Sequence, residues 1–197
     1  MTPREIIYAN LDHTGAPRPG MTFDRGRIND FCQAGMNEGL SYRQKRWTEG
    51  EVEYYDDVWG NLWKRMKDGP IKGEIAKPVI EDWSQLDDLR PPEFDMEAGV
   101  AQMKRAFAAD KDERFKVAGA GGWIFDNARY LRRMEVYFLD MAMYPEELHR
   151  LHAIVAQFYE QRIHAAGKAG ADAVMIGEDM GTQQGLLFSP AMFQAYF

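Results

Sequence analysis

Two short apolar segments, separated by a long stretch of helical pattern, constrain what the second half of this chain can fold into. Residues 116–125 are extended in pattern and rich in glycine, and residues 173–176 form a second apolar run. Between them, residues 127–143 and the segment that begins at Pro145 have apolar residues at helical spacing. Strands that are joined by helical crossovers pair in parallel, so we predict an α/β fold with a parallel sheet.

The apolar spacing also predicts which side chains these helices bury. In the helix over residues 127–143 they are Tyr130, Met134, Phe138 and Met141, and in the helix from Pro145 they are Leu148, Leu151, Val155 and Phe158. A further helix begins at Ser189-Pro190.

The first 114 residues are less regular. Thr2 and Glu5 form a capping box that opens a helix to about Leu11, and residues 13–20 form a loop. Residues 26–47 have a weak helical pattern. An extended segment over 53–66, a turn at 68–70 and a second extended segment over 71–80 are predicted to form a hairpin.

Two helices are predicted to follow the hairpin. Ser84 opens a short one, and Asp95 caps a longer one with Val100, Met103 and Phe107 on its buried face.

Composition excludes several classes of protein. Apolar residues make up 45% of the 197 residues, too many for a disordered chain. The formal charge of −7 argues against nucleic-acid binding, which needs a basic face. Residues 1–7 have no apolar core like that of a signal peptide, and no apolar run approaches the roughly 20 residues of a membrane span, so we expect a cytoplasmic protein without membrane partners. The single cysteine, Cys32, is expected to be a buried thiol without chemistry.

The sharpest chemical signal is the pair Glu178 and Asp179, which directly follows the apolar run 173–176. Ligands of parallel α/β folds bind at the carboxyl ends of the strands, and two adjacent carboxylates there suit a binding site. The alternative interpretation is that Asp179 caps a turn and Glu178 faces solvent.

Other candidate residues each have a structural alternative. Residues 119–123 are rich in glycine, but they lack the third glycine of a dinucleotide fingerprint and end at Trp123. Asp57 and Trp59 would line a pocket rim, or belong to a solvated hairpin with a packed indole. Arg129, Arg132 and Arg133 would meet an anionic ligand or lie on a solvated helix flank. His149 and His152 share a helix face at a spacing that can hold a metal, although packing beside the apolar spine explains them better.

Several short motifs, in order, resemble the uroporphyrinogen decarboxylase superfamily. Residues 119–123 are similar to the family's strand ending in Gly-Ala-Pro-Trp, with Gly122 in place of the proline. They are followed by "PEEL" at 145–148, "AGAD" at 169–172 and "LLFSP" at 186–190. The resemblance is strong from about Phe115 onward and looser before it.

The resemblance implies a TIM-type (β/α)8 barrel with its active site at the carboxyl ends of the strands. Such a barrel needs about 250 residues. We therefore expect residues 1–197 to be a single incomplete barrel domain, truncated to roughly its first half. Residues 1–114 would hold the N-terminal helices and hairpin, and residues 115–197 the first regular β/α units.

The family contains two broad activities, and this sequence resembles the corrinoid-linked methyltransferase branch more closely than the true decarboxylases. Residues 32–36 keep only the middle of the decarboxylase motif Arg-Gln-Ala-Gly-Arg, and both arginines that would hold substrate carboxylates are replaced. Ala128 stands where the decarboxylase has a tyrosine, and Asp179 where it has a serine.

We therefore expect an enzyme that transfers a methyl group between a corrinoid carrier and a small molecule. The alternatives are decarboxylation of the acetate groups of uroporphyrinogen in porphyrin biosynthesis, and a non-catalytic ligand-binding barrel. The residues expected to contact the substrate are Glu178, Asp179, Trp123, Asp57, Trp59 and Arg129.

No catalytic or metal-binding residue is assigned within the chain, because the family's zinc ligands and its chemistry are expected beyond Phe197. The fragment alone is expected to be inactive and to bind no cofactor. Zinc in the full-length protein, a partner protein carrying a corrinoid, and a homodimer are what the resemblance implies.

Overall fold

The computed structural model describes residues 1–23 and 26–197, and its contacts divide the chain into two compact units. The first unit consists of Met1–Ser41, Phe94–Gly121 and Glu160–Ile176. The second unit consists of Tyr42–Glu93, Gly122–Tyr159 and Gly177–Phe197.

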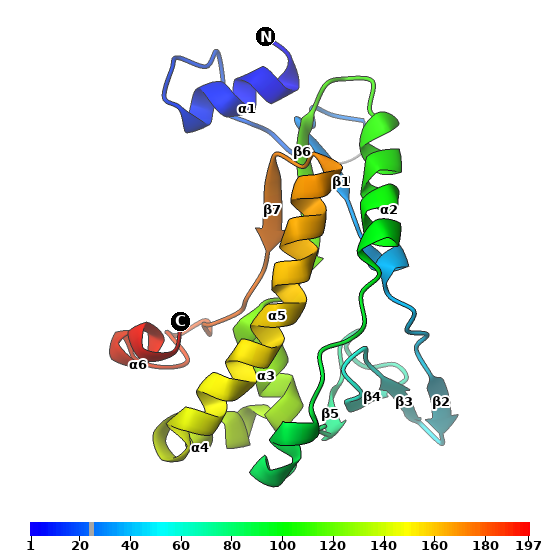
Figure 1. Ribbon diagram of the computed structural model, residues 1–197, viewed down its shortest axis with the longest axis vertical. Coiled ribbons are helices and arrows are strands. Elements are labelled where there is room, and N and C mark those ends of the chain that lie inside the picture. The colour runs from blue at the N-terminus through cyan, green and yellow to red at the C-terminus, as the bar shows by residue number, and fades with distance from the viewer. Residues whose placement is uncertain (24–25) are drawn as a thin grey trace. The chain divides into compact units, whose positions relative to one another are not determined.

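The first unit is built on a three-stranded parallel sheet with the order β1-β6-β7. Its strands are β1 (Phe31–Ala34), β6 (Phe115–Gly121) and β7 (Ala173–Ile176), and β6 lies in the middle (Figure 1). The pairing of β6 with β7 runs from Val117 opposite Ala173 to Gly121 opposite Ile176. The predicted α/β fold with a parallel sheet is confirmed, and the two strands predicted in the second half of the chain are both present.

Strand β1 corrects the weak helical pattern that the sequence shows over residues 26–47. Besides β1, this stretch holds the 3-10 helix η1 (Asn37–Gly39) and the start of β2. Within β1 only Cys32 and Ala34 are fully buried, and four residues are too few to display strand alternation. Pairing with β6 decides the conformation here, and not local propensity.

Helix ends in the first unit follow the predicted signals. Helix α1 (Pro3–Leu11) begins with a complete capping box, in which Thr2 and Glu5 bond each other's backbone N–H. Helix α2 (Met96–Ala108) begins at Asp95, whose carboxylate accepts the Ala98 N–H. The last turns of α5 (Pro145–Ala169) also belong to this unit.

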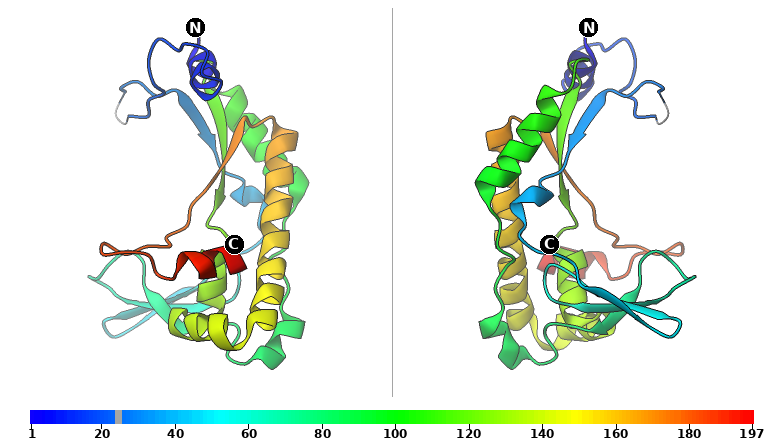
Figure 2. Two further views of the ribbon diagram at one scale, coloured as in Figure 1. Left: turned by 90° about the vertical axis from the view of Figure 1, so that its left-hand side faces the viewer. Right: turned by 90° about the vertical axis from the view of Figure 1, so that its right-hand side faces the viewer.

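Helices cover one face of the parallel sheet along its length, whereas α1 covers only the end where the strands begin (Figure 2). On one side, α2 and the end of α5 pack against the sheet with Met103, Phe107, Ala165 and Ala166, and on the other side Ile7 of α1 packs on Phe115 and Val117. Cys32 is a buried free thiol in the first of these clusters, as predicted, and burial raises the pKa of the thiol.

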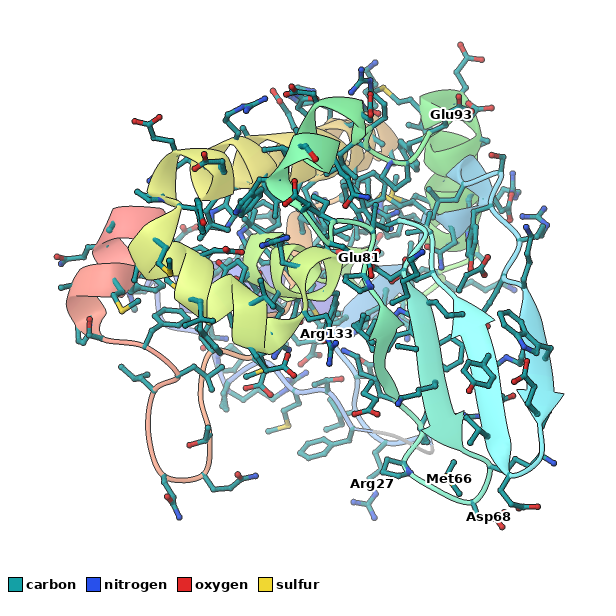
Figure 3. All side chains as sticks on the ribbon, turned by 90° about the horizontal axis from the view of Figure 1, so that it is seen from below. Arg27, Met66, Asp68, Glu81, Glu93 and Arg133 are labelled. Atoms are coloured by element: carbon teal, nitrogen blue, oxygen red, sulfur yellow. The ribbon has the colours of Figure 1, made fainter. Side chains whose placement is uncertain are left out.

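The second unit contains a four-stranded antiparallel sheet with the order β2-β3-β4-β5 (Figure 3). Its strands are β2 (Arg46–Glu49), β3 (Val52–Asp56), β4 (Leu62–Met66) and β5 (Glu74–Lys77). The predicted hairpin with its turn at 68–70 is confirmed as β4 and β5. The single extended segment over 53–66 is wrong, because the chain turns between β3 and β4, where Asp57 accepts two backbone N–H groups and Gly60 has φ +94°.

The single helix expected over residues 127–143 is also wrong. It is two helices, α3 (Ile124–Arg132) and α4 (Met134–Met143), which are separated by Arg133 at φ 67° and ψ 143°. This backbone conformation favours glycine and costs a residue with a side chain about 1–3 kcal/mol. The break rotates the buried stripe: of the four predicted residues only Met141 is buried, and Phe125, Leu131 and Tyr137 take the core positions instead.

The remaining helices of the second unit are the start of α5, the 3-10 helix η2 (Trp83–Asp88) and α6 (Pro190–Tyr196). All four predicted spine residues of α5 are buried. Helix η2 is capped by Asp82 and not by Ser84, while α6 begins at Ser189 as predicted. The described strands form two separate sheets without closing a barrel, and no described helix is both long enough and apolar enough to cross a membrane.

Asp172, at the entry to β7, ties helix α1 to the parallel sheet. Its carboxylate is 4% exposed and accepts hydrogen bonds from Arg4 at 2.5 Å, from the Tyr8 hydroxyl at 2.9 Å and from the Lys116 N–H at 2.9 Å. Burial acts to raise the pKa of Asp172, but these hydrogen bonds outweigh it and hold the pKa below its ordinary value.

We predict that Asp172→Asn lowers the free energy of unfolding at pH 7 by about 1–3 kcal/mol, because the neutral amide weakens the hydrogen bonds that the buried carboxylate accepts from Arg4, Tyr8 and the Lys116 N–H. Since the folded pKa is depressed, this stabilisation is present above the unfolded pKa of about 3.9 and is lost as the pH falls below it. Urea denaturation at pH 7 and at pH 3.5 measures both effects. The matched control is Asp112→Asn, whose carboxylate is 73% exposed. Equal losses in the two variants would contradict the role given to Asp172.

Candidate functional site

The Glu178 carboxyl group lies against the first turn of helix α3. It follows β7 by two residues, and one of its oxygens accepts the Asp126 N–H at 3.2 Å. The residue at the start of α3, Trp123, provides no side-chain cap. Because the first N–H groups of a helix lack partners within the helix, Glu178 supplies from a distant segment the acceptor that α3 lacks.

The protonation of Glu178 is balanced near neutral pH. Burial raises the pKa of Glu178 to about 7, although the Asp126 and Phe125 N–H groups favour the ionised form. The nearby Asp126 carboxylate raises this pKa further and the Arg129 guanidinium lowers it. Glu178 is therefore present in both protonation states at pH 7 and can donate or accept a proton there.

Arg129 neutralises the other carboxylate at this helix end. Its Nη2 lies 2.5 Å from Asp126 Oδ1, and its guanidinium lies over the rings of Phe125 and Tyr130 at 4.9 Å. The next arginine, Arg132, is buried and forms an ion pair with Asp140 at 2.8 Å. Both guanidinium groups are thus occupied by carboxylates of the same unit.

Tyr137 and His152 form a buried pair in the same unit. The Tyr137 hydroxyl lies 2.9 Å from His152 Nε2. Burial lowers the pKa of His152 to about 4, so the ring is neutral at pH 7. The pKa of Tyr137 is raised, first by burial and then by the negative charge of Glu178, which places the two side chains within electrostatic reach of each other. His149 is exposed, and the predicted packing role of the two histidines fits these positions.

Backbone conformation and close packing explain why positions 121 and 122 are glycines. Gly121 has φ +88°, and a Cβ on Gly122 would lie 3.2 Å from Asn127 Nδ2 and 3.4 Å from the Tyr159 hydroxyl. Asn127 uses that nitrogen to bond the Trp123 carbonyl at 2.8 Å. The glycine-rich turn therefore lets the start of α3 pack closely on Tyr159, whose ring also contacts the Trp123 indole.

Asp57 and Trp59 lie in the turn between β3 and β4. The Asp57 carboxylate accepts the Trp63 indole N–H at 2.7 Å and the Asn61 side-chain N–H at 2.9 Å, besides the two backbone N–H groups of the turn. Trp59 is buried edge-to-face on Phe158, and its indole nitrogen is a buried donor without a partner among residues 1–23 and 26–197.

The predicted site residues are thus only partly brought together. Glu178 and Arg129 meet at Asp126, and Trp123 begins the helix that carries both Asp126 and Arg129. Asp57 is engaged in its own turn and Asp179 is exposed. Within residues 1–23 and 26–197, no group of three His, Cys, Asp or Glu side chains is placed to hold a metal ion.

Sequence reasoning missed Asp126 and Tyr137. A carboxylate three residues into a helix is a common capping signal, so Asp126 did not stand out. Tyr137 was hidden by the break at Arg133, which moved it onto the buried face.

We predict that Glu178→Gln alters the dependence of stability on pH. Because the folded pKa of Glu178 is raised above its unfolded value, ionisation costs stability as the pH rises from about 4.5 to above 7. The wild type should lose roughly 1–2 kcal/mol relative to Glu178→Gln over this range, after allowance for partial exposure. Denaturant titrations at pH 5 and pH 8 measure the difference. Asp179→Asn, at the exposed neighbouring carboxylate, should follow the wild type, and a Glu178→Gln curve parallel to the wild type would refute the assignment.

Comparison with known proteins agrees with the order of motifs. The family model described as uroporphyrinogen decarboxylase (URO-D) matches residues 65–197, which is more than half of the chain and includes all of α3 and the Glu178 segment. No curated protein matches the chain. On the strength of the family match, the chain belongs to the uroporphyrinogen decarboxylase family.

Proposed function

We propose that this protein is a URO-D-family enzyme that transfers a methyl group between a corrinoid carrier and a small molecule, with Glu178 as its proton donor and acceptor. The observation that carries the proposal is the half-buried Glu178 carboxyl, which has a pKa of about 7 and is hydrogen-bonded to the first turn of α3. Family membership supports an enzyme at the level of the superfamily. The choice of reaction is our proposal.

The proton at Glu178 suits either direction of methyl transfer. When a small thiol receives the methyl group, its sulfur forms a bond to the methyl carbon while the bond from that carbon to the methyl donor breaks and leaves its electron pair on the donor. The thiol proton passes to the Glu178 carboxylate. When a methylated molecule gives up the methyl group, protonated Glu178 supplies a proton to the departing atom. General acid–base catalysis of this kind is typically worth about 10²–10⁴-fold in rate.

The other predicted contacts have supporting roles in this proposal. The Trp123 and Trp59 rings provide apolar surface. Asp179 is exposed and can contact the substrate, while Arg129 orients Asp126 at the helix start. The Asp57 carboxylate supports the position of Trp59 by accepting the Trp59 backbone N–H.

A corrinoid in this reaction would supply the methyl group or accept it, and we propose that a partner protein carries it. Zinc is part of the proposal for the whole protein only, because the described residues hold no cluster that fits the ion. We derive no step through zinc. A homodimer and a cytoplasmic location are likewise proposals that the family resemblance suggests.

Uroporphyrinogen decarboxylation is the second candidate, because the same carboxyl group could protonate carbon after carbon dioxide leaves. The charge arrangement favours it less. The substrate carries many carboxylates, whereas Arg129 and Arg132 are already paired with Asp126 and Asp140. A polyanion would have to displace these internal partners.

We predict that the whole protein demethylates methylcobalamin in the presence of 2-mercaptoethanol, and that Glu178→Gln in it lowers kcat at least about 100-fold. The absorbance change of the cobalamin measures the rate. In the wild type, the pH profile of kcat should have an arm near pH 7 that Glu178→Gln abolishes. Asp179→Asn should raise KM and leave kcat within about twofold, as expected for a contact that only binds substrate.

A parallel incubation with uroporphyrinogen distinguishes the second candidate. If coproporphyrinogen forms and cobalamin is not demethylated, the protein is a decarboxylase and the proposal of methyl transfer is wrong. If a denaturation curve shows that the protein is folded and neither assay shows activity, the result would favour a non-catalytic barrel and contradict the proposal.

A further inference from the structure

A cavity of about 450 Å³ lies in the second unit beside the break between helices α3 and α4. Strand β5 and the residues before it form one wall, and the start of α4 forms the other. Figure 3 shows Arg133 between α4 and strand β5, at the position of this cavity. Its lining consists of Trp63, Lys72, Gly73, Glu74, Ile75, Tyr130, Arg133, Met134, Glu135 and Phe138. A cavity of this size can hold a molecule of two fused rings.

The walls of the cavity are mainly apolar and aromatic. Trp63 is buried and meets the Tyr130 ring edge-to-face at 4.8 Å. Ile75, Met134 and Phe138 complete the apolar lining, and Met134 is 36% exposed. Flat aromatic walls favour a flat ligand, because rings stack or meet edge-to-face at these spacings.

Four charged side chains line the cavity, and three of them, Glu74, Arg133 and Glu135, form ion pairs. Glu74 lies 3.1 Å from Lys64, and Glu135 lies 3.6 Å from Arg133. Lys72 donates a hydrogen bond to the Tyr130 hydroxyl, and its Nζ lies 4.4 Å from the centre of that ring. In the part of the chain that the structure describes, no carboxylate forms an ion pair with Lys72.

The position of α4 at the cavity depends on an unfavourable backbone conformation of Arg133. Its positive φ produces the break between the two helices, and the break places the start of α4 at the cavity. A glycine would adopt the same conformation without strain, yet the position carries a guanidinium that lines the cavity. Arg133 is therefore a second cation of the lining, and Glu135 pairs with this arginine.

We propose that this cavity binds a flat apolar molecule that carries a single carboxylate. The ring of the ligand lies among Trp63, Tyr130 and Phe138, and its carboxylate pairs with Lys72. This site is separate from Glu178, which contacts the opposite end of α3 and does not line the cavity.

Isothermal titration calorimetry with naphthalene-2-carboxylate tests the proposal. We expect saturable binding at one site, and weaker binding of naphthalene-2-methanol, which has the same rings without the charge. Lys72→Met should weaken binding of the carboxylate about fivefold and leave binding of the alcohol unchanged, as expected for the loss of one exposed ion pair.

The matched control is Lys67→Met, which removes the same charge from an exposed position outside the cavity lining. It should bind the carboxylate as the wild type does, and so should Glu178→Gln. No saturable binding of the carboxylate, equal affinity for the alcohol, or equal effects of Lys72→Met and Lys67→Met would each overturn the proposal. A loss of carboxylate binding in Glu178→Gln would assign the ligand to the Glu178 site instead.

Discussion

The candidate site depends on a carboxyl group that is removed from water and held against the start of a helix. Two influences oppose each other at Glu178: the N–H groups of α3 favour the ionised form, and burial favours the protonated form. Burial is the stronger, and the pKa settles near 7. The same contact gives the first turn of α3 an acceptor, so the side chain that we propose as the proton donor also supports the fold.

The surrounding charges limit what the site can bind. Asp126 with Arg129 and Asp140 with Arg132 are neutralised in pairs, and His152 is neutral beside Tyr137. The neighbourhood of Glu178 can thus exchange a proton without offering a cluster of free guanidinium groups. This arrangement suits a small substrate better than a polyanionic one, and it is the physical basis of our preference within the URO-D family.

Strands β6 and β7, the caps of α1, α2 and α6 and the α5 spine were predictable, because apolar period and capping residues are local signals. Strand β1 was not, because its partner β6 is more than 80 positions away in the chain. The break at Arg133 gave no signal either, since arginine is a good helix former. In the site, the sequence pointed to the Glu178–Asp179 pair. Which of the two carboxyl groups is buried follows only from tertiary packing.

A carbon-13 NMR titration of the glutamate side-chain carboxyl groups tests the central claim most directly. The Glu178 resonance is assigned by its absence from the spectrum of Glu178→Gln. Its titration midpoint should lie near pH 7, well apart from the exposed glutamates. A midpoint between about 4 and 5 would mean that the group is an ordinary helix cap, and would contradict its role as a proton donor at neutral pH.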